Sequence, residues 1–270
     1  MHILSVKYSE ERQGYSSHHH DAHELLYIVS GKISVNIGGE EWVAESGSLL
    51  IFNRFEDHSI RILTEEYRRY ALLISSEISQ TADNYLLTSV LVNRSPDFRH
   101  IINCGESRAT IESLLEDMLT EFSLKRPIYE KALSSSLIRI LIELYRISPK
   151  LFLSAENRNT EIVREIQSRF ECNFSEQFAL RSLAAEYHVS ASHLAHIFKQ
   201  ITGYSPIEYL MSCRLSAAKN MLSASEKSIK EIIDLCGYSD ESNFSRMFKT
   251  RVGLTPTEFR RQNFHKLLDK

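Results

Sequence analysis

The first part of the chain is a succession of short apolar runs separated by turns. Residues 33–37 alternate apolar and polar side chains with a period of two, which is typical of a half-buried strand. Further short runs, rich in β-branched and aromatic residues, cover residues 25–29, 42–44, 48–52 and 68–74. Gly38 and Gly39 lie between two of these runs, where a hairpin turn needs them. Residues 1–85 are therefore predicted to form a small antiparallel β-barrel or jelly roll.

The period changes to that of a helix in residues 86–150. Apolar residues recur on one helical face over residues 111–122, Pro127 interrupts the pattern, and a second apolar face covers residues 133–145. Two helices laid on a small barrel usually have apolar surface left over. We therefore predict a helical dimerisation segment for a homodimer, with burial in the chain's own core as the alternative.

Residues 151–160 become polar at their end and are predicted to be a linker, and residues 161–270 have helical periodicity throughout. This last part contains a degenerate repeat. The sequence SASHLAHIFK at residues 190–199 is echoed by DESNFSRMFK at residues 240–249, and each copy follows a short helical stretch. A short helix, a turn and a second helix are the parts of a helix-turn-helix. An all-α domain with two such units is therefore predicted.

The two predicted turns differ in detail. Gly237 supplies a positive φ in the second turn, and Asp240 is placed to cap the helix that follows. The second turn is also one residue longer than the first. Residues 206–222 have helical spacing and are predicted to connect the two units.

Residues from about 165 to 262 resemble the DNA-binding domain of AraC-family transcription regulators. The matching residues are Ala184, Ser190, Leu194, Phe198, Lys199, Gly203, Ser205, Pro206, Tyr209, Arg214, Ala218, Leu222, Ile229, Ile232, Gly237, Tyr238, Asp240, Phe244, Arg246, Phe248, Lys249, Gly253, Thr255 and Pro256. Ile233 departs from a usual alanine, which is a modest packing difference. The resemblance implies a transcription regulator whose two recognition helices enter successive major grooves of double-stranded DNA. Its usual outcome is activation through recruitment of RNA polymerase.

The resemblance further implies that exposed positions near the start of each recognition helix read base edges. These positions are Ser192, Ala195 and His196 in the first helix, and Ser242, Asn243 and Arg246 in the second. Arginine can pair with guanine and asparagine with adenine, whereas alanine offers only a methyl contact. The first helix is therefore expected to discriminate less. Lys199 and Lys249 are expected to bind phosphate. A surface phosphate contact is the alternative for Arg246, and a phosphate or solvent role is the alternative for His196.

The barrel contains a cluster of candidate ligands. The spacing of His18, His20 and Glu24 resembles the first motif of cupins, and His58 after Gly47 resembles the second. The four positions His18, His20, Glu24 and His58 match the metal ligands of a cupin, and imidazole with carboxylate suits a transition metal. The second motif is incomplete, because Asn53, Phe55 and Ile62 replace the expected proline, glycine and asparagine. Sensor barrels of AraC-type regulators also commonly keep such residues without a metal.

We therefore predict that His20, Glu24, Trp42 and His58 contact a small-molecule effector, and that the chain needs no metal or other cofactor. A metal site and a purely structural network remain alternatives. Trp42 and Tyr27 are candidate pocket walls, although aromatic residues are more often core. A sugar-like effector is suggested by its frequency in the family. The predicted fold class is α+β multidomain, with an N-terminal antiparallel cupin-like β-barrel, a helical dimerisation segment and a C-terminal double helix-turn-helix domain.

Composition narrows the class further. The 270 residues are 43% apolar and 25% charged, as in soluble globular proteins. No apolar run approaches the length of a membrane span, and residues 1–12 lack the apolar core of a signal peptide. The four scattered cysteines suit buried thiols in a reducing cytoplasm. A metal-dependent cupin enzyme is the rival class, and the double helix-turn-helix pattern argues against it, so no catalytic residue is predicted.

Overall fold

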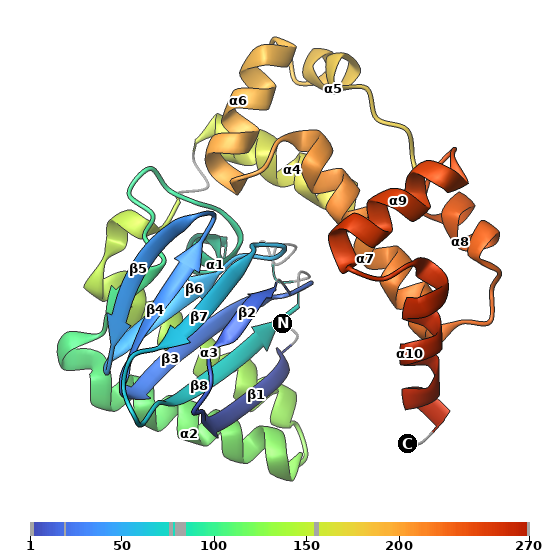
Figure 1. Cartoon of the computed structure of the whole chain (residues 1–270). Coiled ribbons are helices and arrows are strands. Elements are labelled where there is room, and N and C mark those ends of the chain that lie inside the picture. Colours follow the sequence, from blue (N-terminus) through green and yellow to red (C-terminus); the bar gives the residue numbers. More distant parts are fainter. Residues whose placement is uncertain (1–2, 19, 76–77, 79–84, 154–156, 269–270) are drawn as a thin grey trace. The chain divides into compact units, whose positions relative to one another are not determined.

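The computed structural model of the chain describes residues 3–18, 20–75, 78, 85–153 and 157–268. The chain divides into two compact units, Met1–Thr160 and Glu161–Lys270 (Figure 1). Part of the predicted linker is helical, because α4 (Arg158–Cys172) begins inside it, and residues 154–156 of that linker lie outside the described residues. Among the helices described, none is long and apolar enough to cross a membrane.

The N-terminal unit is built on two antiparallel sheets that enclose a core (Figure 1). In the described part of the chain, sheet A has the order β1-β8-β3-β6-β9 and sheet B the order β2-β7-β4-β5. The strands are β1 (Ile3–Glu10), β2 (Tyr15–His18), β3 (His23–Ser30), β4 (Lys32–Ile37), β5 (Glu40–Glu45), β6 (Ser48–Phe52), β7 (His58–Ile62), β8 (Arg68–Ile74) and β9 (Ile101–Asn103).

Sheet A is covered on both faces, which explains why residues 25–29 form a continuous apolar run rather than an alternating one. Leu26 and Ile28 of β3 lie in the core between the two sheets, whereas Leu25 and Tyr27 lie in a second core. The second core is completed by three helices, α1 (Tyr85–Val92), α2 (Arg108–Leu124) and α3 (Tyr129–Ile147). Alternation along β3 therefore separates side chains that face the barrel interior from those that face the helices.

The sheets extend beyond the boundary predicted at residue 85. Strand β9 lies in the segment predicted to be helical, and it pairs with β6 through Leu49 and Ile102. Three residues are too few for a period of two to be visible in the sequence. Strands β1, β2 and β7 and helix α1 were also not singled out from the pattern. Short 3₁₀ helices cover Gly105–Ser107 and Pro149–Leu151.

The apolar faces predicted for a dimer seam lie in the core of the same chain. Ile111 and Met118 of α2 and Leu137 and Leu141 of α3 are fully buried against one another and against sheet A. The alternative interpretation, burial in the chain's own core, therefore holds for these side chains. A homodimer stays a prediction, and it requires surface other than these residues.

The C-terminal unit is helical and contains the two predicted helix-turn-helix units. The first consists of α5 (Leu180–Glu186) and α6 (Ala191–Thr202), and the second of α8 (Ile229–Leu235) and α9 (Glu241–Val252). Helix α7 (Pro206–Ala224) connects them, and α10 (Pro256–Leu268) follows the second unit. The two recognition helices, α6 and α9, are N-capped by Ser190 and Asp240, and the second of these caps was predicted from the sequence.

The loop between α4 and α5 is hydrogen-bonded to the second helix-turn-helix and to the connecting helix α7. Arg214 of α7 donates from Nε to the carbonyl of Phe174 and from Nη2 to that of Glu176, both at 2.7 Å. Gln177 donates from Nε2 to the carbonyl of Gly237 at 3.0 Å. Gly237 has the predicted positive φ, +76°. The loop therefore fixes the turn of the second unit against the connecting helix.

Candidate functional site

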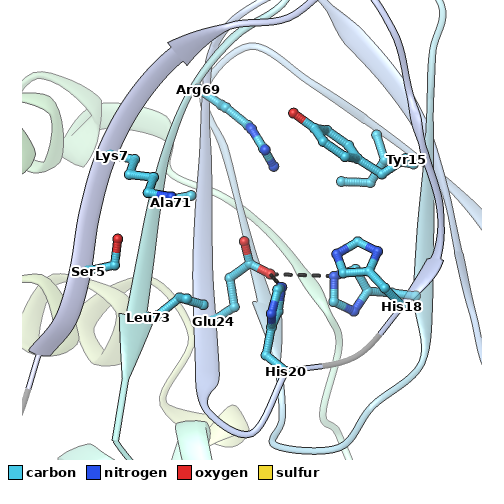
Figure 2. A pocket seen from close by; sticks show the side chains of 11 residues that line it. Ser5, Lys7, Tyr15, His18, His20, Glu24, Arg69, Ala71 and Leu73 are labelled. Carbon is cyan, nitrogen blue, oxygen red and sulfur yellow. Dashed lines mark ion pairs between the residues drawn. The ribbon is translucent and has the colours of Figure 1, made fainter. Parts of the chain in front are cut away.

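A pocket of about 170 Å³ opens between the two sheets of the N-terminal unit (Figure 2). Strands β1, β3 and β8 form one side, β2 and β7 form the other, and His20 lies between β2 and β3. The lining residues are Ser5, Lys7, Tyr15, His18, His20, Glu24, His58, Ile60, Arg69, Ala71 and Leu73. Eight of these 11 residues have polar or charged side chains.

The candidate ligands that lie far apart in the sequence meet in this pocket. The Oε2 atom of Glu24 lies 3.3 Å from Nε2 of His20 and 3.4 Å from Nε2 of His58. The ring of His18 lies 4.5 Å from that of His58 and 5.0 Å from that of His20, measured between centroids. Glu24 is carried on β3 and faces the barrel interior because it alternates with the outward-facing Leu25.

Burial and charge act in opposite directions on these groups. Burial alone would raise the pKa of the Glu24 carboxyl, but its interactions with His20 and His58 outweigh burial and lower this pKa to about 2. Burial lowers the pKa of His18 against the effect of its hydrogen bond to the carbonyl of Ser16, and the neighbouring imidazoles lower it further. Glu24 is therefore a buried carboxylate that faces the imidazoles of His20 and His58.

The two aromatic residues considered as pocket walls lie elsewhere. Trp42 is on β5, at the opposite edge of sheet B from β2, where it pairs with Val35 and is 41% exposed. It is not among the described residues that line the pocket. Tyr27 faces the helices, and its hydroxyl donates to Oε1 of Glu112 at 2.8 Å. The predicted pocket role of Trp42 is therefore wrong for this pocket, and Tyr27 belongs to the helix-facing core.

The pocket also contains cations that the sequence analysis did not find. Arg69 of β8 is 13% exposed, and its guanidinium lies 4.7 Å from the ring centroid of Tyr15. Lys7 of β1 lines the same side of the pocket (Figure 2). Arg69 shares a strand face with Ala71 and Leu73, so the period of β8 contained the signal. The pairing of β8 with β1 and β3, which brings these strands to the pocket, did not follow from the sequence.

In the C-terminal unit, the residues predicted to read DNA lie on the outer faces of the recognition helices. Ser192, His196 and Lys199 are exposed on α6, and Ala195 is half-buried beside them. A shallow hollow on α6 is lined by Ala195, His196, Lys199 and also Gln200, which was not predicted. The opposite face of the helix carries Leu194, Ile197 and Phe198 in the core.

Helix α9 presents a face of the same kind. Ser242, Asn243, Arg246 and Lys249 are exposed, while Phe244 and Phe248 are fully buried. The guanidinium of Arg246 makes a long contact of 3.4 Å from Nε to the carbonyl of Ser242 on its own helix. The side chain is therefore held along the first turns of α9, where a recognition helix contacts base edges.

Comparisons with known proteins agree with this architecture. A family model described as an AraC-like ligand binding domain matches residues 6–142, more than half of the chain, and a helix-turn-helix domain model matches residues 183–262. The transcriptional activator RhaR of Pectobacterium atrosepticum is 26% identical over 249 residues, covering 91% of this chain and 86% of RhaR. The uncharacterized regulator YdiP of Escherichia coli is 23% identical over 262 residues, covering 94% and 84%. A crystal structure of ToxT from Vibrio cholerae has a TM-score of 0.60 at 15% identity, covering 96% of this chain and 97% of ToxT.

A ligand-binding sheet domain and a double helix-turn-helix domain on one chain define a transcription regulator. The chain belongs to the AraC family of these regulators, in agreement with the resemblance of its C-terminal part. The family is not one of enzymes, so the rival interpretation as a cupin enzyme is set aside. The fold of the whole chain is also that of ToxT.

Proposed function

We propose that this regulator activates transcription by binding double-stranded DNA sequence-specifically, under the control of a small effector in the barrel pocket. The observation that carries the proposal is the pair of recognition helices, α6 and α9, which expose polar side chains at equivalent positions. The name of RhaR, which is called a transcriptional activator, supports activation over repression.

In this proposal Arg246 and Asn243 read guanine and adenine edges in one major groove, while Ser192, Ala195 and His196 read the neighbouring groove. Ser242 assists at the start of α9. Lys199 and Lys249 bind phosphates, because each lies on the exposed side of its recognition helix, one residue after the buried Phe198 or Phe248. A homodimer would join two such domains and raise their effective concentration on paired half-sites. Recruitment of RNA polymerase and a cytoplasmic location complete the proposal.

The effector is proposed to be small and hydroxyl-rich, such as a sugar. The support is the set of hydrogen-bonding side chains in the pocket, where His20, Glu24 and His58 lie with Lys7 and Arg69. ToxT has been crystallised with an unsaturated fatty acid. A pocket of about 170 Å³ is small for a long acyl chain.

The test is selection of genomic DNA fragments by the purified full-length chain, run with wild type, Arg246→Ala and Arg12→Ala in parallel. We expect wild type and Arg12→Ala to enrich one spaced motif, and Arg246→Ala to lose or relax one half of it. Arg12 is an exposed arginine of the N-terminal unit and controls for lost charge. Failure of wild type to enrich any motif at moderate salt, with or without candidate sugars, would overturn the proposal.

A further inference from the structure

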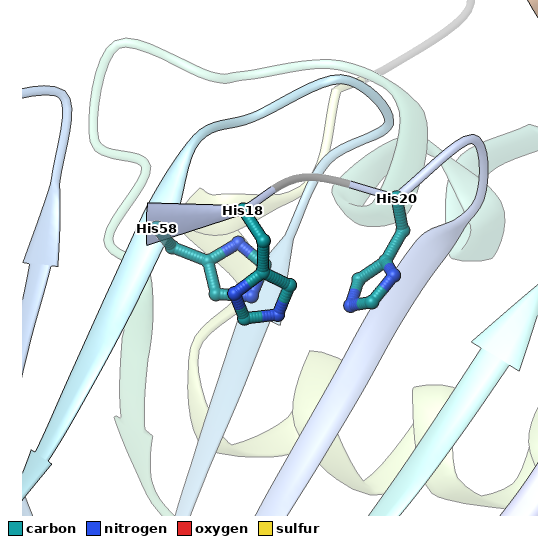
Figure 3. A group of neighbouring side chains, drawn as sticks. All are labelled: His18, His20 and His58. Atoms are coloured by element: carbon teal, nitrogen blue, oxygen red, sulfur yellow. The ribbon is translucent and has the colours of Figure 1, made fainter. Parts of the chain in front are cut away.

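We propose that His18, His20, His58 and Glu24 together bind one divalent transition-metal ion in the barrel pocket. The inference rests on the proposed function only in that the ion lies in the pocket proposed for the effector. Figure 3 shows the imidazoles of His18, His20 and His58 turned toward one another, and their candidate ligand atoms all lie within 4.8 Å of each other.

The distances around Glu24 already match those of a metal site. Two ligand atoms that each lie about 2.1 Å from one tetrahedral ion are about 3.4 Å apart. The Oε2 atom of Glu24 lies 3.3 Å from Nε2 of His20 and 3.4 Å from Nε2 of His58. The wider separations among the imidazoles would close by roughly 1–1.5 Å when an ion draws them to the same spacing.

Backbone carbonyls orient two of the imidazoles as metal ligands. Nδ1 of His18 lies 2.9 Å from the carbonyl oxygen of Ser16, and Nδ1 of His58 lies 3.0 Å from that of Glu56. A carbonyl only accepts hydrogen bonds, so Nδ1 carries a proton in each ring, and in the neutral imidazole Nε2 presents a lone pair. Metal-binding histidines are held in this way by outer partners. The ring of His58 is also stacked on Phe52, with centroids 4.0 Å apart.

This arrangement leaves buried acceptors facing each other. Oε2 of Glu24 makes no hydrogen bond to any of the described residues, although its side chain is only 6% exposed. It lies 3.4 Å from Nε2 of His58, which presents a lone pair to the carboxylate when that imidazole is neutral. Buried acceptors without partners are costly. A proton can bridge only one pair of acceptors, whereas a divalent cation can be coordinated by all four side chains at once.

The ligand types select the class of metal. Three imidazoles with one carboxylate suit Fe²⁺, Zn²⁺, Ni²⁺ or Cu²⁺ better than Ca²⁺ or Mg²⁺, which take oxygen ligands. The pocket continues from the cluster toward Arg69 and Lys7 (Figure 2). An ion held by these four side chains therefore has a side open to the pocket, where oxygen atoms of an effector can complete its coordination.

The test is titration of the full-length, chelator-stripped protein with Co²⁺, followed by visible absorption, which reports coordination of this ion directly. We expect saturation at one Co²⁺ per chain and displacement by Zn²⁺. His18→Gln and His20→Gln should each weaken Co²⁺ binding by more than about tenfold, because outer-shell partners alone change metal affinity by about 10- to 100-fold. Both side chains are partly exposed, so these variants should keep the fold, which circular dichroism checks.

The matched control is His193→Gln, which removes an exposed imidazole of α6 and should bind Co²⁺ as wild type does. Glu24→Gln, a second variant of similar shape, should also weaken binding. The proposal is overturned if wild type takes up no Co²⁺ at millimolar concentration, or if His18→Gln and His20→Gln both bind it like wild type. DNA binding by the same stripped preparation separates the two proposals. DNA binding without Co²⁺ uptake removes only the metal site, and Co²⁺ uptake without DNA binding removes only the proposed function.

Discussion

The turns of the two helix-turn-helix units each contain a residue of positive φ at the end of the first helix, but the residue that occupies this position differs. In the first unit His188 has φ +56°, and in the second Gly237 has φ +76°. The two residues are equivalent, because each donates from its backbone N–H to the carbonyl three residues earlier, Ala185 or Asp234. The left-handed conformation is therefore imposed by the fold in both units, and glycine meets it without strain in only one.

The difference follows from what surrounds each turn. A Cβ at Gly237 would lie 2.3 Å from the carbonyl oxygen of Ser175, in the loop that also bonds to Gly237 through Gln177. His188 is exposed, so its side chain has room even though its backbone is strained. Glycine is required where the loop packs on the turn, and histidine is tolerated where the side chain is exposed.

The largest effect expected is from Gly237→Ala. The new methyl group must displace the loop carbonyl of Ser175 and must also adopt a left-handed conformation. Backbone strain of about 1–3 kcal/mol and a comparable cost for overpacking should together lower the free energy of unfolding by about 3 kcal/mol or more. Urea unfolding of the full-length chain, followed by circular dichroism, measures this loss.

Gly253→Ala is the matched control for that change. Gly253 has φ +81°, but a Cβ there would meet nothing within 4 Å. Only conformational strain of about 1–2 kcal/mol is then expected. Equal losses in the two variants would show that the contact with the loop contributes nothing, and that the difference between the two turns has another origin.

The same two turns show how far the sequence predicts the fold. The helices were predictable from the local spacing of apolar residues. The positive φ of Gly237 was predictable because glycine in a turn commonly adopts this conformation. The strain at His188 was not, since no local rule places a histidine there. The contact between Gly237 and Ser175 was not predictable either, because it joins segments far apart in the chain. Strand β9, which is too short to show a period of two, and the burial of the α2–α3 faces also required the structure.

The second prediction compares the recognition helices at equivalent positions. His196 of α6 and Arg246 of α9 occupy the same place relative to the buried Phe198 and Phe248. Arg246→Ala should weaken binding to the selected DNA site by about 1–3 kcal/mol, because a bidentate contact to guanine is lost. His196→Ala should cost less, since an imidazole cannot form that contact. Binding titrations on the same operator, with each half-site mutated in turn, measure both. A larger loss for His196→Ala would reverse the assignment of the stronger reader.

The candidate site residues also differ in how far the sequence predicts them: some follow from local spacing, and others depend on which strands pair. The exposed faces of α6 and α9 followed from helical spacing alone. In the barrel, the motif spacing predicted that His18, His20, Glu24 and His58 form a site, and in the structure these four residues line one pocket. Arg69 was missed because its role in the pocket depends on the pairing of β8 with its neighbours. Trp42 does not line this pocket, and residue type alone did not reveal which edge of sheet B its strand occupies.

The third prediction concerns two residues at which the units should not differ. Lys199 and Lys249 are both exposed in the last turn of their recognition helices. Lys199→Ala and Lys249→Ala should each reduce the salt dependence of DNA binding by about one ion and weaken binding equally on specific and unrelated sequences. Filter-binding or fluorescence titrations over a range of salt concentrations measure the slope. A change in sequence preference in either variant would assign that lysine to base reading.

The smallest effect expected is a gain in stability from His188→Gly, which gives the first turn the residue that the second already has. Relief of the left-handed strain, about 1–2 kcal/mol, is partly offset by the greater chain entropy of glycine, about 0.5–1 kcal/mol. We therefore expect the free energy of unfolding to rise by roughly 0.5–1 kcal/mol, measured by urea unfolding. His188→Ala keeps the Cβ and the strain while removing the imidazole, so it should bring no such gain. A gain of equal size in both variants would mean that the imidazole, and not the backbone conformation, destabilises the first turn.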